Sequence, residues 1–251
     1  PAVVLQAGEQ ARAVLVDVGD LRLLYTGDVC TRDRDYLCGC SPPSADIVVM
    51  EATYGKPRYE FPPLTEVIED AVGWLDAHPD RPAFLFGYAF GKAQRIIRLI
   101  ATAGRDRVFT TPAVLRINEA ISEAVGVEFA VHPFDRDQEL GGDDAIVLPS
   151  QLAGTSWVEE YVERVDGVTA GFSGWAVDES YRYRRGFDRG FPLSDHCDCS
   201  ELCTLVESVD PEIVYTLHGF ARPLARRLTK MGIEANALRG DQATLANFSD
   251  G

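Results

Sequence analysis

The sequence predicts an α/β fold, and three features of the chain lead to that prediction. Its 251 residues can bury a sizeable core, either as one large domain or as a core with a second lobe. Hydrophobic residues make up 46% of the chain and charged residues 25%, which excludes disordered, collagen-like and disulfide-scaffold proteins. Short apolar runs alternate with longer segments in which apolar residues recur at helical spacing. Such alternation is typical of βαβ units around a mainly parallel sheet.

The first predicted elements are a hairpin, a buried strand and a helix. Residues 13–18 and 21–25 have the pattern of two strands, and the Gly-Asp pair between them predicts a hairpin turn. The apolar run 47–50 predicts a buried strand. A helix is predicted over 65–78, where apolar residues follow helical spacing.

The rest of the chain supplies the alternating units. Strands are predicted at 83–87, 108–110, 127–131 and 145–148, and helices at 92–103, 113–125 and 157–164. After segments at 168–173 and 176–183 and a turn rich in Gly and Arg, the chain is expected to close with a helix from about Cys199, a strand at 212–217, a helix at 220–231 and a strand at 233–238. No apolar run approaches the ~18 residues of a membrane-spanning helix, so we expect no membrane partner.

The chain is strongly acidic, with 39 Asp and Glu against 24 Lys and Arg and a net charge of −15. Only three basic residues are Lys, and this acidic, Lys-poor composition predicts a protein from a halophilic archaeon; the alternative is an ordinary acidic protein from a GC-rich genome. The chain opens without a basic segment followed by an apolar one, so we expect a cytoplasmic location. The net charge alone disfavours nucleic acid as a partner, but basic residues gather at 92–98 and 182–189, which would confine positive potential to a groove.

Polar residues follow several predicted strands, where ligands bind in open α/β sheets. They are Asp28, Glu51, His218 and, at the start of a helix, Asp195 and His196. Each one alone is more often a turn residue, a cap or a satisfied surface residue. Together they are first-row metal ligands and their supporting groups, which could activate water against a phosphodiester. In this interpretation Asp28 bridges metals, and Glu51 orients His196 as a general acid.

A glycine-rich turn between a predicted strand and helix is a candidate phosphate site. Gly91 lets the backbone approach a ligand, and Lys92 and Tyr88 stand beside the free N–H groups of the helix start. The glycine spacing is not that of a Walker A loop, and a plain strand-to-helix turn is the alternative.

Arginine and aromatic residues interleave just before His196. This pattern suits a track for nucleic acid, in which charges meet phosphates and rings stack on bases; the alternative is a solvated strand with a polar face. The arginines concerned are Arg182, Arg184, Arg185 and Arg189.

The six cysteines do not have zinc-ribbon spacing, and free thiols are the leading interpretation. Cys30, Cys38 and Cys40 follow Asp28, whereas Cys197, Cys199 and Cys203 surround or follow His196. An accessory metal site or a redox pair at one common point is the alternative hypothesis.

Taken in order, these motifs resemble the β-CASP nucleases of the metallo-β-lactamase fold. The nearest branch is similar to the ligase-associated and crosslink-repair DNA exonucleases and to archaeal relatives described as mRNA 3′-end processing factors. The resemblance runs from about Leu23 to about Gly232. The motifs are Tyr25-Thr26-Gly27-Asp28, Glu51-Ala52-Thr53-Tyr54-Gly55, Gly91-Lys92-Ala93-Gln94, Ser194-Asp195-His196 and His218-Gly219.

The resemblance implies an αββα sandwich in two parts, 1–55 and 166–251, with a β-CASP cap inserted over 56–165. It also implies metal ligation by Asp28 and His218, two zinc ions (Mn or Mg being alternatives), and catalytic roles for the other motif residues. The implied activity is that of a metal-dependent nuclease, a 5′-exonuclease on DNA or RNA in DNA repair or RNA processing, with a DNA ligase or helicase as partner.

The chain departs from the family pattern before Asp28. The cluster His-x-His-x-Asp-His is expected there, yet no His precedes His78, and Glu9 stands near the place of another expected His. Two hypotheses follow: the chain is truncated at its N-terminus, or it descends from a relative that lost metal. The second would make it a non-catalytic nucleic-acid-binding homologue or subunit, and a small-molecule hydrolase of the same superfold is a third, weaker alternative.

Overall fold

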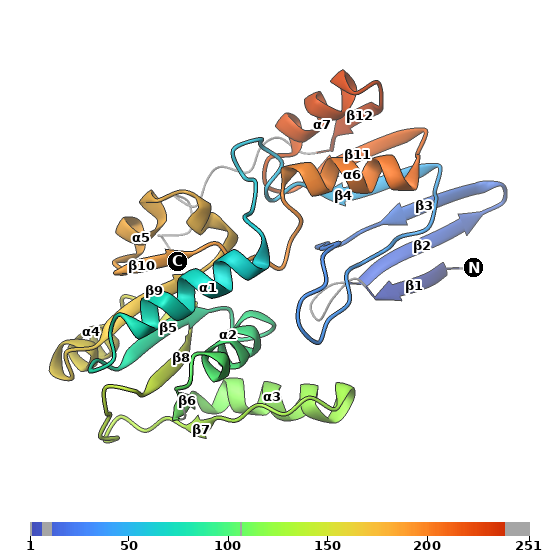
Figure 1. The fold of residues 1–251 in the computed structure, drawn as a ribbon. Coiled ribbons are helices and arrows are strands. Elements are labelled where there is room, and N and C mark those ends of the chain that lie inside the picture. Colours follow the sequence, from blue (N-terminus) through green and yellow to red (C-terminus); the bar gives the residue numbers. More distant parts are fainter. Residues whose placement is uncertain (1, 7–11, 106, 239–251) are drawn as a thin grey trace. The chain divides into compact units, whose positions relative to one another are not determined.

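The computed structural model describes residues 2–6, 12–105 and 107–238, which fall into two compact units (Figure 1). Unit 1 comprises Pro1–Glu60 and Asp195–Gly251, and unit 2 comprises Phe61–Ser194. The second boundary lies at 194/195 rather than at the expected 165/166, because the strands after residue 165 pair with the sheet of unit 2. The first boundary lies at 60/61 rather than at 55/56.

Unit 1 is built on a six-stranded mixed sheet in the order β1-β2-β3-β4-β11-β12. Its strands are β1 (Ala2–Gln6), β2 (Arg12–Val18), β3 (Leu21–Tyr25), β4 (Ile47–Glu51), β11 (Ile213–Leu217) and β12 (Glu234–Ala237). The first three are antiparallel neighbours, and the last four run parallel to one another. The predicted hairpin is confirmed as β2 and β3, whereas β1 was not predicted.

One face of this sheet carries the core of unit 1. Met50 and Val214 are buried in a cluster with apolar side chains of α6 (Cys199–Val209) and α7 (Ala221–Lys230). Residues that alternate with these along the strands, such as Val49, point to the other face of the sheet and are half-buried. An αββα sandwich needs a second sheet on that face, and the described residues of unit 1 form one sheet. The α/β class is therefore confirmed, and the sandwich stays a prediction.

Unit 2 is built on a second six-stranded sheet, ordered β10-β9-β5-β8-β6-β7, in which every neighbouring pair is parallel. Its strands are β5 (Ala83–Gly87), β6 (Val108–Thr110), β7 (His132–Pro133), β8 (Ala145–Pro149), β9 (Val168–Phe172) and β10 (Arg189–Phe191). This arrangement confirms the parallel sheet that the alternating pattern predicted.

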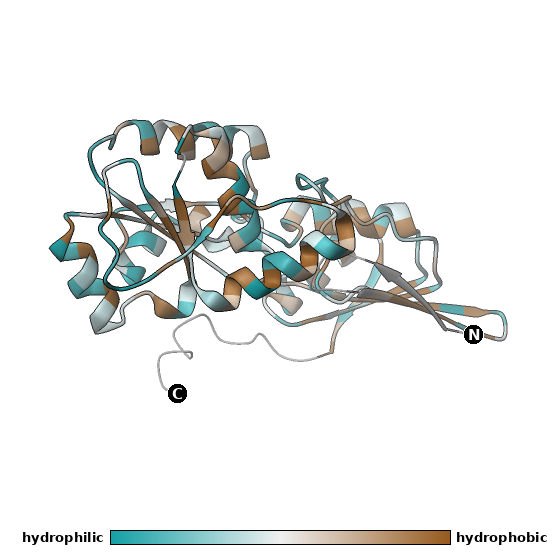
Figure 2. Ribbon diagram, turned by 90° about the horizontal axis from the view of Figure 1, so that it is seen from below, coloured by the Kyte–Doolittle hydropathy of each residue, from teal (hydrophilic) through white to brown (hydrophobic). Residues whose placement is uncertain are grey.

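The four inner strands of the unit 2 sheet, β9, β5, β8 and β6, are buried on both faces, which explains why they are almost uniformly apolar. Leu85 belongs to a core cluster on one face, and its neighbour Phe84 belongs to a second cluster on the other. Figure 2 shows strands at the centre of this sheet in brown, as hydrophobic segments. The first face packs against α1 (Leu64–Asp76), α2 (Lys92–Thr102) and α3 (Pro112–Val125), and the second against α4 (Ser156–Arg164) and α5 (Ser180–Arg185).

One predicted strand was wrong, and one alternative is ruled out. Residues 127–131 do not form a strand: Phe129 and Val131 pack partly against the core, but only His132–Pro133 pairs with β6. The Arg- and Tyr-rich stretch is the helix α5 rather than a solvated strand, and Gly186, with a left-handed φ of 67°, ends it. Among the helices that the structure describes, none combines the length and apolar character needed to span a membrane.

Candidate active site

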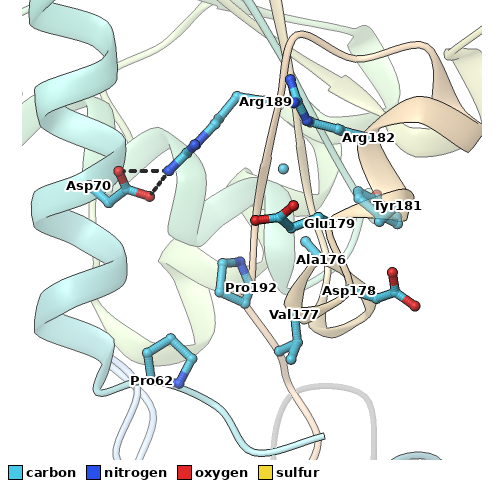
Figure 3. A pocket seen from close by; sticks show the side chains of 11 residues that line it. Pro62, Asp70, Ala176, Val177, Asp178, Glu179, Tyr181, Arg182, Arg189 and Pro192 are labelled. Carbon is cyan, nitrogen blue, oxygen red and sulfur yellow. Dashed lines mark hydrogen bonds and ion pairs between the residues drawn. The ribbon is translucent and has the colours of Figure 1, made fainter. Parts of the chain in front are cut away.

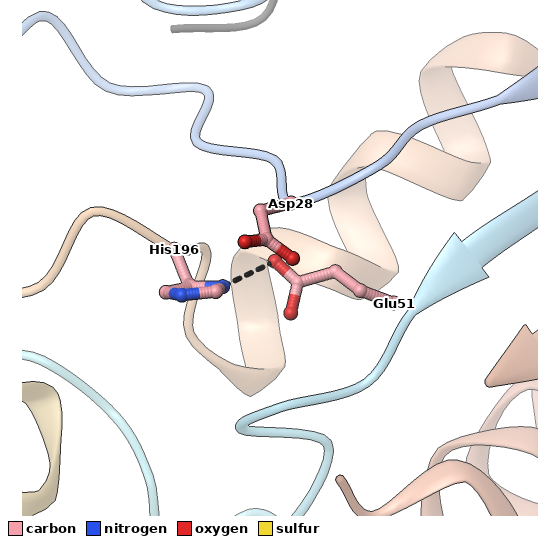
Figure 4. Close-up of side chains that lie close together, drawn as sticks. All are labelled: Asp28, Glu51 and His196. Carbon is pink, nitrogen blue, oxygen red and sulfur yellow. Dashed lines mark hydrogen bonds and ion pairs between the residues drawn. The ribbon is translucent and has the colours of Figure 1, made fainter. Parts of the chain in front are cut away.

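Asp28, Glu51 and His196 come together in unit 1, where Figure 4 shows their polar groups pointing toward one another. One ligand-type atom from each residue lies within 4.8 Å of the others. Asp28 lies in the turn after β3, Glu51 is the last residue of β4, and His196 precedes α6. Because β3 and β4 are parallel neighbours, their carboxyl ends meet at one edge of the sheet and bring the two carboxylates together.

Glu51 is the buried centre of this site. Its Oε1 accepts hydrogen bonds from the Val29 N–H at 3.0 Å and from His196 Nδ1 at 2.8 Å. Its Oε2 accepts from the Thr53 N–H at 3.2 Å and from the Thr53 hydroxyl. Burial raises the pKa of Glu51, but the charge of His196 and these hydrogen bonds outweigh burial, so the pKa lies below its usual value. Glu51 is therefore an ionised acceptor.

The bond to Glu51 determines the state of the His196 ring. A carboxylate can only accept, so Nδ1 carries a proton and Nε2 is the ring atom turned away from Glu51. The His196 side chain is 26% exposed, and its ring forms a T-shaped contact with the Tyr54 ring, with centroids 5.9 Å apart. His196 can thus exchange a proton with a ligand through Nε2.

Two arginines that the sequence analysis missed hold the backbone of the His196 loop. Arg32 donates to the His196 carbonyl at 3.1 Å, and Arg34 donates to the Asp195 carbonyl at 3.2 Å. Thr53, which bonds Glu51, was also missed, although its spacing two residues after Glu51 was a signal. Asp195 is half-buried beside His196, and its carboxylate is not part of the cluster with Asp28.

The chemistry of the donors fits one divalent cation. Asp28 is exposed, and its carboxylate faces that of Glu51, so a positive charge between them would relieve their repulsion. Carboxylate oxygens suit Zn²⁺, Mn²⁺ or a similar ion, and His196, whose Nδ1 is bonded to Glu51, is then a supporting group rather than a ligand. A pair of zinc ions, each with about four ligands, needs more donors than the described residues bring together here.

Two other predicted metal positions do not join this cluster. His218 follows β11, whose Leu217 pairs with Glu51, but its ring belongs to no metal-type group among the residues that the structure describes. It is exposed, with a left-handed φ of 59°. Glu9 lies outside the described residues.

The predicted phosphate site lies in unit 2, at the carboxyl end of β5. Gly91 takes a φ of 83° and precedes α2, whose first residue is Lys92. Tyr88 is 58% exposed, and its ring centroid lies 6.0 Å from Lys92 Nζ. Lys92 is buried and packs against Gly87, so a phosphate would reach this ammonium group only through a limited opening.

The four predicted substrate-binding arginines do not form one track. Arg182 and Arg189 line a pocket of about 370 Å³ in unit 2, shown in Figure 3. Arg189 bonds both carboxylate oxygens of Asp70, at 3.0 and 2.7 Å, and Arg182 donates to the Asp188 carbonyl. Arg184 donates to the Ser180 hydroxyl, and Arg185 donates to the Ser150 carbonyl. Each arginine thus has an acceptor within unit 2.

The cysteines separate into groups instead of converging at one point. Cys30 lies near Cys40 and Cys197, and Cys199 lies near Cys203, while Cys38 is exposed. Burial raises the pKa of the Cys40 and Cys197 thiols, and the neighbouring Cys30 adds to the effect. These two thiols are therefore inert at neutral pH.

Comparisons with known proteins show a sequence relative and structural neighbours of this chain. Over 223 residues the chain is 35% identical to a protein named "Probable DNA ligase" from Opitutus terrae. The match covers 87% of this chain and 21% of that protein, so the chain spans about a fifth of the relative's length. No model of a protein family matches the chain.

One structural neighbour is a crystal structure of a protein of unknown function from Enterococcus faecalis V583. The superposition has a TM-score of 0.59 and covers 97% of this chain and 63% of the other. Only 12% of the residues are identical, so the likeness concerns the fold alone.

Proposed function

We propose that this chain is the nuclease part of a protein that hydrolyses phosphodiester bonds in DNA or RNA with a divalent metal ion, as a 5′-exonuclease of the β-CASP type. The cluster of Asp28, Glu51 and His196 carries the proposal, because it places two carboxylates beside a histidine whose Nδ1 is held by Glu51. The similarity to a protein named "Probable DNA ligase" supports a role on nucleic acid and a ligase as partner in DNA repair.

A divalent cation at Asp28 would stabilise negative charge on the phosphate and lower the pKa of a bound water. The chain's own residues supply orientation and a proton. Glu51 holds Nδ1 of His196, and Thr53 and Val29 hold Glu51 in turn. A protonated His196 then donates from Nε2 to the leaving oxygen, and the nearby carboxylate stabilises the imidazolium. Lys92 and Tyr88 would receive a terminal phosphate.

A metal-supplemented nuclease assay tests this proposal. The chain is incubated with Mn²⁺, Mg²⁺ or Zn²⁺ and with DNA or RNA strands that carry a 5′-phosphate or a 5′-hydroxyl. His196→Ala is expected to slow cleavage by about 10²- to 10⁴-fold, the usual contribution of a general acid. His132→Ala is the matched control, because His132 is exposed in unit 2. Cleavage by His196→Ala at the wild-type rate would refute the assigned role.

The phosphate site has a separate test in Lys92→Ala. If Lys92 receives a terminal phosphate, this substitution slows cleavage of 5′-phosphorylated strands and leaves 5′-hydroxyl strands unaffected. An equal loss on both substrates rejects the site while leaving the nuclease proposal in place. Circular dichroism of the variant checks that unit 2 remains folded, since Lys92 is buried.

A second candidate function is a nucleic-acid-binding subunit without catalysis. It is favoured by one observation: the described residues bring only three metal-type side chains together at the site. In that case the chain binds DNA or RNA without cleaving it, and Asp28→Asn leaves binding unchanged. If the chain cleaves nucleic acid in a metal-dependent way and Asp28→Asn abolishes that cleavage, the nuclease proposal holds and the non-catalytic candidate is rejected.

A further inference from the structure

Two cations lie over aromatic rings in the loop that follows β4 in unit 1. Lys56 Nζ lies over the face of the Phe220 ring, 4.0 Å from its centroid. The guanidinium carbon of Arg58 lies 4.8 Å from the centroid of the Tyr59 ring, and Arg58 also donates to the Tyr59 hydroxyl at 2.6 Å. The Tyr59 and Phe220 rings are stacked on each other, with centroids 5.3 Å apart. One pair of rings therefore holds both cations in place.

The rings hold these cations without neutralising them. A ring attracts a cation through its quadrupole but carries no net charge. Among the residues that the structure describes, the Lys56 ammonium has no hydrogen bond or ion pair, and the Arg58 guanidinium donates only to the uncharged Tyr59 hydroxyl. Arg189, in contrast, bonds both carboxylate oxygens of Asp70. Lys56 is half-buried and Arg58 is exposed, so both can bind an anion from solution.

These cations lie at the same edge of the unit 1 sheet as the candidate active site. β4 and β11 are parallel neighbours, so the loops that follow them begin side by side. The Phe220 N–H joins the two loops by donating to the Ala52 carbonyl at 2.6 Å. The Tyr54 ring contacts the Tyr59 ring, with centroids 5.5 Å apart, and it contacts the His196 ring as well. Positive charge thus lies near carboxylates that would otherwise repel a strand of phosphates.

We propose that Lys56 and Arg58 bind backbone phosphates of a nucleic-acid strand and so hold it at the candidate active site. This role rests on the proposed nuclease function and adds contacts to the substrate away from the reacting phosphate. Tyr59 and Phe220 are only 3% and 5% exposed, so their rings are closed to stacking bases and the contact is one of charge. Contacts to phosphates position a strand without reading its sequence. We therefore expect equal binding of strands that differ in sequence.

The salt dependence of binding tests this role. The whole chain is titrated against fluorescently labelled single strands of DNA and RNA at NaCl concentrations from about 0.15 to 1 M, with chelator present so that no metal-dependent cleavage occurs. Each phosphate contact to a single strand contributes about 0.7 to the slope of log Kd against log salt concentration. Lys56→Gln and Arg58→Gln are each expected to lower this slope by about 0.7, which corresponds to about fourfold weaker binding at the lowest salt concentration. The matched control is Lys230→Gln, because Lys230 is exposed at the end of α7 farthest from Phe220.

The same titrations separate the charge of Lys56 from its packing on Phe220. Lys56→Arg keeps the cation and is expected to retain the wild-type slope. A slope that Lys56→Gln leaves unchanged, or that Lys56→Gln and Lys230→Gln lower equally, would overturn the proposal, as would a wild type that binds neither strand. Failure of the nuclease proposal has a different result: the wild type then binds with the expected salt dependence but does not cleave the strand after Mn²⁺ or Mg²⁺ is added.

Discussion

Replacement of Glu51 by glutamine should destabilise unit 1 although the two side chains have nearly the same shape. Glu51 is 2% exposed and receives two hydrogen bonds on each carboxylate oxygen. Glutamine keeps one oxygen and presents an NH₂ group to two donors on the other side. Bonds to a charged acceptor contribute about 1.5–3 kcal/mol each and neutral ones about 0.5–1.5, so two weakened bonds lose about 2–3 kcal/mol together. Of the two donors that face NH₂, the Thr53 hydroxyl or the His196 ring can turn to accept, and the remaining backbone N–H is left unmatched at about 1–3 kcal/mol, which makes the total roughly 3–6 kcal/mol.

The assay must report on unit 1, because Trp74, Trp157 and Trp175 all lie in unit 2 and tryptophan fluorescence follows that unit. Hydrogen exchange of the amides in β4 and β11 measures the free energy of opening of the unit 1 sheet directly. This free energy of opening is measured at pH 7, with chelator present, in the wild type and in Glu51→Gln. Glu212→Gln, which alters an exposed carboxylate of unit 1, is the matched control. A loss below about 1 kcal/mol in Glu51→Gln would refute the account of Glu51 as a buried charged acceptor.

Four further substitutions test the packing and capping of the two units by chemical denaturation. Gly171→Ala should cost unit 2 about 1–3 kcal/mol, because a Cβ there would lie 2.3 Å from the Phe187 ring; Gly73→Ala, which meets no atom within 4 Å, should instead stabilise it by about 0.5–1 kcal/mol. Arg105→Lys should cost unit 2 about 2–4 kcal/mol, since lysine cannot replace a guanidinium that donates to five carbonyls. Asp198→Ala should cost unit 1 about 0.5–2 kcal/mol through loss of the α6 capping box. A stabilised Gly171→Ala, or changes under about 0.3 kcal/mol in Arg105→Lys and Asp198→Ala, would contradict these contacts.

Burial patterns along the chain determined most of the secondary structure. The uniformly apolar β5 and the helical spacing of apolar residues in α1 are local signals. A strand buried on both faces is apolar throughout, and a helix buried on one face has apolar residues every three or four positions. The exceptions are segments whose conformation depends on distant partners. Residues 127–131 have the composition of a strand but do not pair, and α5 is too short and polar to show a helical period.

The sequence alone also identified Asp28, Glu51 and His196, because polar residues at strand ends are unusual in apolar surroundings. Only the tertiary structure decided which of the candidates meet. The order β3-β4-β11 determines the sheet edge at which Asp28 and Glu51 lie. His218 has a left-handed backbone, and its side chain lies outside the cluster. The spacing of residues along the chain specifies neither the order of strands in a sheet nor the direction in which a side chain points.

The hydrogen bond that Arg227 donates to Cys203 was likewise decided by the tertiary structure. The sequence supplied six cysteines and a hypothesis that they converge, but the packing of α6 against the core and α7 separated them into different environments. The physical reason is general. A residue's type and its local period follow from the chain, whereas its pKa and its partners follow from burial and from charges that folding brings within a few ångströms.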